Sequence, residues 1–414
     1  MLRLVAYRVR NGVRNGSGIR RCAATMGLIA ALTMAFAASA GVQPQPLGAS
    51  PRDPIVASSL MNHYQISTEY GRFEVHGDAM LRRLRAELRA IDTLHHMSRG
   101  TTFGESLKEA VTGPFRGAKE LISRPAKTFG AVSNALARVP GRARAAVNGT
   151  ASLYEDNMAE GLLSVSRRKR EHADALGVDV YSSNRALQRE LDSVAWSGAA
   201  GGLGVSAGIA VATMGGSIAT SNLTRTSDLR DIMRTRSAAE LRMDARRALK
   251  QSGVGKNLID RFLDHPWYSP RHEIMIAASL LALEGAQGRE QFLERALDAK
   301  SEESALMFQQ MAEMMRGYHR SVAPITQVRV MLGIPLVDDG KGRVAALLPF
   351  DHCHWTGRVA ELATHIATQV KTEQVQAELS LWTPGSVTPR ARQGFAAVGI
   401  QVRQRSNAVL PLLD

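Results

Sequence analysis

The sequence predicts a mainly α-helical protein with helical N-terminal and central domains and a small C-terminal α/β module. Along most of the chain, apolar residues recur at intervals of three and four, which is the spacing of one face of an α-helix. The last ninety residues instead alternate short apolar runs, typical of strands, with helical stretches. Of the two cysteines, only Cys353 follows the N-terminal leader, so the mature chain can form no intramolecular disulfide and its core must hold the fold.

Residues 1–40 are predicted to be a secretory signal peptide. They contain six arginines and no acidic residue, an apolar run over residues 22–36, and Ala38-Ser39-Ala40, which has the pattern of a cleavage site. An N-terminal anchor that stays uncleaved is the alternative. The pair Arg20-Arg21 leaves the twin-arginine route open beside the general secretory route.

Removal of this leader lowers the formal net charge from +14 to +8, because its six arginines leave with it. The 374 residues that remain are enough for two or three domains. A basic exported protein is attracted to anionic lipid or cell-wall polymer. We therefore expect a periplasmic or membrane-associated protein of the cell envelope. Its partner would be an anionic membrane surface or an envelope protein, with no nucleic acid, and its oligomeric state stays open.

Residues 41–98 are predicted to hold an extended leader, a hairpin and a helix. Residues 65–77 contain two short alternating runs around Tyr70-Gly71, which is typical of a β-hairpin. Asp78 then has the position of a helix cap. The apolar residues that follow it lie on one helical face: Leu81, Leu84, Leu88, Ile91 and Leu94.

Residues 99–150 form a basic segment with nine basic and three acidic residues, divided by three prolines into short amphipathic pieces. A basic amphipathic helix can lie on an anionic membrane surface. A surface helix that covers a core has the same pattern, and this alternative stays open.

Residues 151–226 read as helices followed by the Gly/Ala-rich segment 196–220, with Asn184 as a helix cap. Segment 196–220 is uncharged and long enough for a bilayer, and its small residues recur every four positions. Its low hydrophobicity leaves two interpretations open, a single transmembrane helix or a glycine-rich helix packed inside the protein.

Residues 227–320 are predicted to be an all-helical domain. Ser237 and Glu240 have the spacing of a capping box, and Ser269-Pro270 places a cap and a proline at the start of another helix. A further helix begins near Ser301, and its methionines are expected to fill the core.

Residues 321–414 are predicted to be the α/β module. Asp338-Asp339-Gly340-Lys341-Gly342 separates two apolar runs and indicates a hairpin. A helix from Gly357, a strand over residues 377–382, a helix from Thr388-Pro389 and a strand over residues 400–404 follow. This alternation predicts a partly parallel sheet.

The sequence Asp351-His352-Cys353-His354-Trp355 is the best candidate for a metal site. It follows a predicted strand, at a position where α/β proteins often place their sites. On an extended backbone His352 and His354 point the same way and could both bind a metal ion, whereas Cys353 points away from them. No third ligand can be identified, and surface histidines without a metal have the same pattern.

Other motifs give weak signals. The sequence around Ser206 matches the Gly-x-Ser-x-Gly elbow of hydrolases, yet no strand formers precede it. The turn Gly253-Val254-Gly255 resembles a phosphate-binding hairpin of DNA-binding proteins, but a plain helix–helix turn is the favoured interpretation. We find no HExxH or CxxC motif, assign no catalytic residue and predict no cofactor.

Five stretches are similar to a known family in their local sequence and in their order along the chain: residues 71–80, 187–196, 265–270, 301–313 and 388–400. Through them the chain resembles a family of uncharacterised exported proteins of Gram-negative bacteria. The resemblance implies export and a similar architecture, and it transfers no functional residue.

These observations favour a non-enzymatic, exported protein of the cell envelope that associates with the membrane surface or with a protein partner. The alternative is an exported enzyme with its site at the strand end from Asp351 to His354.

Overall fold

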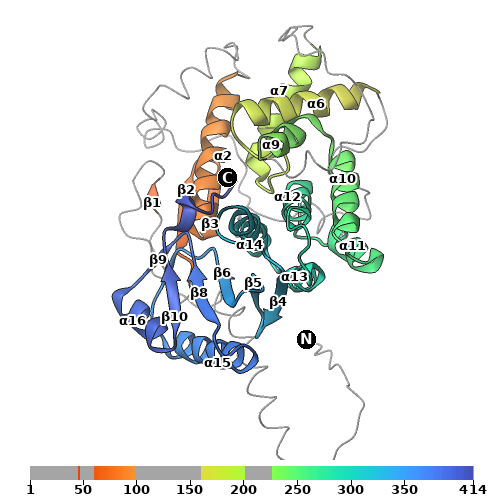
Figure 1. Cartoon of the computed structure of the whole chain (residues 1–414). Helices are drawn as coiled ribbons and strands as arrows, with labels where there is room; N and C mark the ends of the chain where they lie inside the picture. Colours follow the sequence, from red (N-terminus) through yellow and green to blue (C-terminus); the bar gives the residue numbers. More distant parts are fainter. Residues whose placement is uncertain (1–44, 47–59, 98–159, 201–225, 414) are drawn as a thin grey trace, which may run out of the picture. The chain divides into compact units, whose positions relative to one another are not determined.

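The computed structural model describes residues 45–46, 60–97, 160–200 and 226–413, all of which belong to one compact unit, Gly41–Asp414 (Figure 1). Eleven α-helices and ten strands lie in these residues, and the helices hold most of them, so the predicted mainly α class is confirmed. The predicted signal peptide, the basic segment 99–150 and residues 201–220 of the Gly/Ala-rich segment lie outside the described residues.

The predicted hairpin is present and begins two residues earlier than expected. Strands β2 (His63–Thr68) and β3 (Gly71–His76) pair antiparallel, and β1 (Gln45–Pro46) pairs parallel with β2. One face of the hairpin is apolar and buried through Tyr64, Phe73 and Val75. Because side chains alternate between the faces of a strand, this burial fixes the register and directs the residues between them to the opposite face.

Helix α2 (Asp78–Met97) follows the hairpin and packs against it. All five apolar positions predicted to share a face, from Leu81 to Leu94, are buried in a cluster with the hairpin residues. Helices α6 (Glu160–Ala175) and α7 (Arg185–Ala200) complete this cluster, and α9 (Thr226–Thr235) contacts α6. Asn184 caps α7 as predicted, since its Oδ1 accepts a hydrogen bond from the N–H of Ala186 at 3.1 Å.

Five helices form the central part: α10 (Ala238–Gln251), α11 (Lys256–Leu263), α12 (Pro270–Leu281), α13 (Arg289–Ala296) and α14 (Glu302–Ser321). The predicted caps at Ser237 and Ser269 both form capping boxes. Residues 272–280 of α12 are buried without a gap, so this helix is surrounded by the others. The methionines of α14 that are buried in this core include Met311, Met314 and Met315.

The C-terminal part is built on a five-stranded sheet in the order β10-β8-β6-β5-β4. Its strands are β4 (Gln327–Met331), β5 (Ile334–Asp338), β6 (Arg343–Leu347), β8 (Glu378–Trp382) and β10 (Ile400–Arg403). Strands β6, β8 and β10 are parallel and β4, β5 and β6 antiparallel, which confirms the predicted partly parallel sheet.

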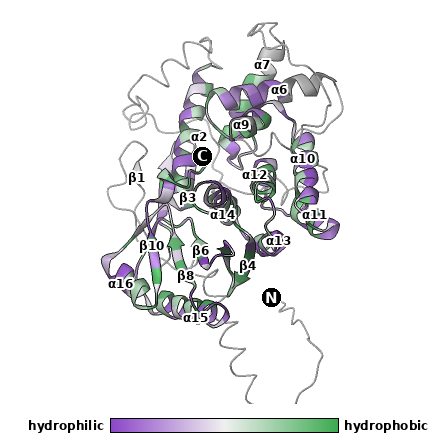
Figure 2. Cartoon of the chain, in the orientation of Figure 1, coloured by the Kyte–Doolittle hydropathy of each residue, from purple (hydrophilic) through white to green (hydrophobic). Residues whose placement is uncertain are grey.

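The two faces of the sheet belong to two apolar clusters. One face packs with α15 (Gly357–Glu373) and α16 (Pro389–Ala397). The other contributes Val337, Ala345 and Leu347 to the core that holds α14. Figure 2 shows hydrophobic, green stretches along β4 and β8, whereas α6 is largely purple and hydrophilic.

The apolar run before the predicted hairpin forms two strands and not one arm of the hairpin. Residues 328–337 fold into two strands, β4 and β5, which turn at Leu332-Gly333. Both turn residues have positive φ, 50° and 80°, as a type I′ turn requires. Leucine is an unusual residue at positive φ, so of the two turn residues only Gly333 was typical of such a turn.

Candidate functional site

The residues from Asp351 to His354 lie where the sheet meets the N-terminal hairpin. His352 and Cys353 form the short strand β7 (His352–Cys353), which pairs parallel with β9 (Ser386–Val387). The backbone N–H of Asp351 donates a hydrogen bond to the carbonyl of Leu60 at 3.1 Å, just ahead of β2. The predicted strand-end position is therefore confirmed, and a segment nearly three hundred residues away in sequence lies beside it.

His352 and His354 lie close together, with ring centroids 5.2 Å apart and the rings nearly perpendicular. Burial and the neighbouring His354 lower the pKa of His352, which favours its neutral, metal-binding form. Cys353 points away into the apolar cluster beneath α15 and α16, and burial raises its pKa to about 11. The pair remains a two-ligand candidate, because no third metal-ligating side chain of the described residues converges on it.

The carboxylate of Asp351 connects its own strand end with the residue before β2, Asn62, and with the start of α2. Its Oδ2 accepts hydrogen bonds from the N–H of Asn62 at 2.8 Å and from the N–H of Asp78 at 3.0 Å. Asp78 is the first residue of α2, so Asp351 caps this helix from a distant part of the chain and its charge interacts favourably with the helix dipole.

The side chain of Asp78 adds contacts with the hairpin and the residue before it. Its Oδ1 accepts hydrogen bonds from the Asn62 amide at 2.8 Å and from the Tyr64 hydroxyl. Burial, with the bond to Asp78, raises the pKa of Tyr64, and burial raises the pKa of Asp351 to about 6 against the opposing effect of the two N–H groups. Two carboxylates thus share one partly buried polar site.

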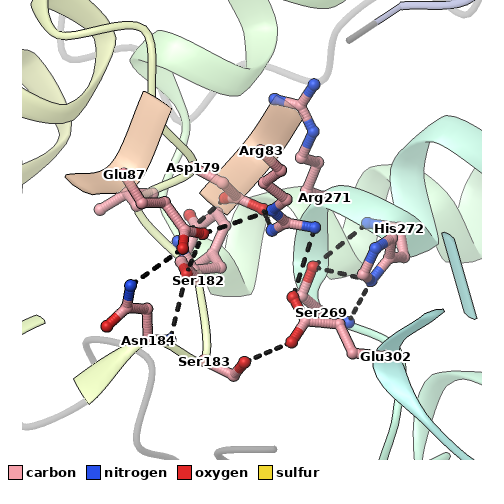
Figure 3. A network of polar contacts seen from close by, with 12 residues as sticks. Arg83, Glu87, Asp179, Ser182, Ser183, Asn184, Ser269, Arg271, His272 and Glu302 are labelled. Carbon is pink, nitrogen blue, oxygen red and sulfur yellow. Dashed lines mark hydrogen bonds and ion pairs between the residues drawn. The ribbon is translucent and has the colours of Figure 1, made fainter. Parts of the chain in front are cut away.

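A second polar cluster lies around Arg83 of α2 and is drawn in Figure 3. The guanidinium contacts Asp179 Oδ2 at 2.6 Å, Glu302 Oε1 at 3.3 Å and Glu87 Oε1 at 3.6 Å. The three carboxylate residues are each less than 10 % exposed. One cation therefore joins α2, the loop before α7 and the first residue of α14.

Hydroxyl and amide groups of the loop before α7 satisfy the remaining carboxylate oxygens. Glu87 accepts from the Ser182 hydroxyl at 2.6 Å and from the Asn184 amide at 3.0 Å, and Ser183 donates to Glu302. Such a network stabilises a buried ion cluster because each charge keeps hydrogen-bond partners. Sequence reasoning missed it, since only the spacing of Arg83 and Glu87 is a local signal.

Ser269 and His272 have part of the geometry of a nucleophile and its base. The Ser269 hydroxyl lies 3.1 Å from His272 Nδ1, and burial lowers the pKa of His272 to about 4. However, Nδ1 also accepts the N–H of Ser269, and both residues are buried at the start of α12. This pair acts as the capping box of α12, with no access for a substrate at either side chain.

The described residues contain one set of three metal-ligating side chains whose donor atoms converge: His63, Glu74 and His76 of the β2–β3 hairpin. None of these three residues was predicted from the sequence to bind a metal ion. His63 lies just before the range assigned to the hairpin, and Glu74 and His76 lie within it without having been recognised as a pair across the strands.

Comparisons of the chain with protein-family models, with curated proteins and with solved structures find no match. Within the described ranges, no helix combines the length and the apolar character that crossing a bilayer requires.

Proposed function

We propose that this chain is an exported protein of the cell envelope that acts by association with the membrane surface or with a protein partner, and not by catalysis. Its arginine-rich leader, the +8 charge of the mature chain and the basic segment 99–150 support this proposal. We also propose that the chain is organised into helical N-terminal and central domains and a small C-terminal α/β module.

The observation that carries the proposal is that the Asp351 carboxylate is hydrogen-bonded within the fold. An active site at this strand end would depend on its carboxylate, and that carboxylate is bonded to the N–H groups of Asn62 and Asp78 at the start of α2. This carboxylate is therefore already used to hold the start of α2 in place. The polar groups of the strand end therefore fit a structural joint better than a catalytic site.

Cell fractionation tests the proposal. The full chain with an epitope tag after Asp414 is expressed in a Gram-negative host, and osmotic shock, alkaline carbonate extraction and protease accessibility of the tag are measured. Release with the periplasm, or carbonate-extractable association with the membrane, supports an exported surface-binding protein. Resistance to carbonate indicates an inserted segment, either 196–220 or an uncleaved N-terminal anchor, and retention in the cytoplasm contradicts export.

The alternative is an exported enzyme with its site at Asp351, His352 and His354. The raised pKa of Asp351, about 6, beside two adjacent imidazoles favours it, because perturbed pKa values are frequent in active sites. A stoichiometric metal ion that survives dialysis and is lost in the His352→Ala/His354→Ala double variant would support this alternative over the first proposal.

A further inference from the structure

The polar face of the β2–β3 hairpin brings three metal-ligating side chains together. His63 pairs directly with His76, and Gln65 pairs with Glu74, so Glu74 is the diagonal neighbour of His63. Directly opposed residues of an antiparallel pair have Cβ atoms about 5 Å apart, and their side chains share one face of the sheet. The burial of Tyr64, Phe73 and Val75 on the other face holds this arrangement in place.

The donor atoms are already close to the spacing that a metal ion needs. One donor atom from each of His63, Glu74 and His76 lies within 4.8 Å of the other two. His63 Nε2 and Glu74 Oε1 are 2.7 Å apart, and the two imidazole rings stack with centroids 4.4 Å apart. Ligand atoms around a tetrahedral zinc ion lie about 3.3 Å apart, so small side-chain rotations are sufficient.

We propose that His63, Glu74 and His76 form a binding site for a divalent transition-metal ion of the zinc class. Two imidazole nitrogens and one carboxylate oxygen suit Zn²⁺, Ni²⁺ or Cu²⁺. Ca²⁺ and Mg²⁺ prefer sites made of oxygen atoms alone. The proposal does not depend on export or on the function proposed above.

The surroundings of the three ligands favour a site that is accessible from one side. The side chain of His63 is 5 % exposed, whereas that of Glu74 is 57 % exposed. An ion held by three protein ligands keeps one coordination position open for water or for a ligand of a partner. Glu303, near the start of α14, lies close enough to His76 to act on its charge.

Without a metal ion, the same three side chains contact one another directly. His63 Nε2 lies 2.7 Å from Glu74 Oε1, and the ring of His76 stacks on that of His63. This direct contact is the alternative use of these residues.

The test is metal binding by the purified full chain after treatment with EDTA and dialysis. Isothermal titration with ZnSO₄ and elemental analysis give the affinity and the stoichiometry. We expect one Zn²⁺ per chain and an affinity at least about tenfold lower in Glu74→Gln, because even indirect partners of a metal ligand contribute about that much. Because the Glu74 side chain is exposed, this variant should keep its fold, and a thermal melt without metal checks it.

Co²⁺ supplies a second readout, since its visible absorption reports coordination by imidazole directly. The His76→Gln variant should lose this absorption, and the matched double variant His352→Ala/His354→Ala should keep both the absorption and the zinc affinity. Unchanged affinity in Glu74→Gln and His76→Gln would overturn the proposal. Loss of binding in the His352/His354 variant alone would overturn it as well and would place the metal at the strand end.

Discussion

The carboxylate of Asp351 accepts hydrogen bonds from the backbone N–H of Asp78, a residue 273 positions earlier in the chain. Asp351 follows β6, and Asp78 begins α2, so one side chain connects the C-terminal sheet with the N-terminal hairpin and helix. Asp351, which the sequence offered as part of an enzymatic site, is thus also a structural contact between two distant parts of the chain.

Replacement of Asp351 by alanine should destabilise the protein by about 2–3 kcal/mol. The substitution leaves the N–H groups of Asn62 and Asp78 without their acceptor and removes a favourable charge from a helix N-terminus. Urea unfolding followed by circular dichroism measures the change. Asp351→Asn keeps one acceptor oxygen and should lose about half as much.

The control for this prediction is His354→Ala, three residues away. The side chain of His354 is exposed, so its removal should change the free energy of unfolding by no more than about 0.5 kcal/mol. Equal stability of Asp351→Ala and His354→Ala would show that the Asp351 contacts do not hold the two segments together.

Local signals predicted much of the helical framework. The caps at Asn184, Ser237 and Ser269 act within three residues of themselves, so their effect can be read from a short window of sequence. The contacts of Asp351 and of Arg83 could not be predicted in this way. Their partners are brought together only by the packing of the apolar clusters.

The proximity of His63, Glu74 and His76 could have been predicted from the sequence. The turn residues Glu69 and Tyr70 fix the antiparallel register, and every pair across the strands follows from them, including His63 with His76. The alternating pattern indicated a hairpin only from residue 65 onward, so His63 lay outside the predicted range. Sequence boundaries of strands are commonly uncertain by this amount.

Arg83→Met should destabilise the protein by about 3–5 kcal/mol, because it leaves Glu87, Asp179 and Glu302 buried together without their cation. The comparison is Arg167→Met, which removes an exposed ion pair with Glu171 on α6 and should cost no more than about 1 kcal/mol. Chemical unfolding of both variants at neutral pH provides the test. A similar loss in the two variants would mean that the Arg83 network contributes no more than a surface pair.

Gly385→Ala should be strongly destabilising, by about 3 kcal/mol or more. A Cβ atom at this position would lie 2.1 Å from the carbonyl oxygen of Phe350 and 2.2 Å from that of Asp351, so backbone would have to move. Gly357→Ala is the matched control, because nothing lies within 4 Å of its Cβ and it begins α15. Thermal unfolding should separate the two variants clearly, and equal melting temperatures would contradict the close approach at Gly385.

Glu313 gives the chain a dependence of stability on pH. Burial raises its pKa from 4.5 to about 7, although the N–H of Leu413, the amide of Gln309 and the charges of Arg316 and Arg271 oppose the shift. The folded state therefore holds a proton at pH values where the unfolded chain has lost it. This contribution to stability is complete below pH 4.5, decreases as the pH rises, and is lost above about pH 7.

Glu313→Gln should remove this contribution, so the variant should gain stability relative to the natural chain as the pH rises. The gain between pH 5 and pH 8 should be roughly 2–3 kcal/mol, the equivalent of about two pKa units. Urea unfolding of both proteins at the two pH values measures it, and Glu361→Gln, an exposed change on α15, serves as the control. Parallel pH profiles of the natural chain and Glu313→Gln would mean that this carboxyl is ionised in the folded protein and held by its donors, among them the N–H of Leu413.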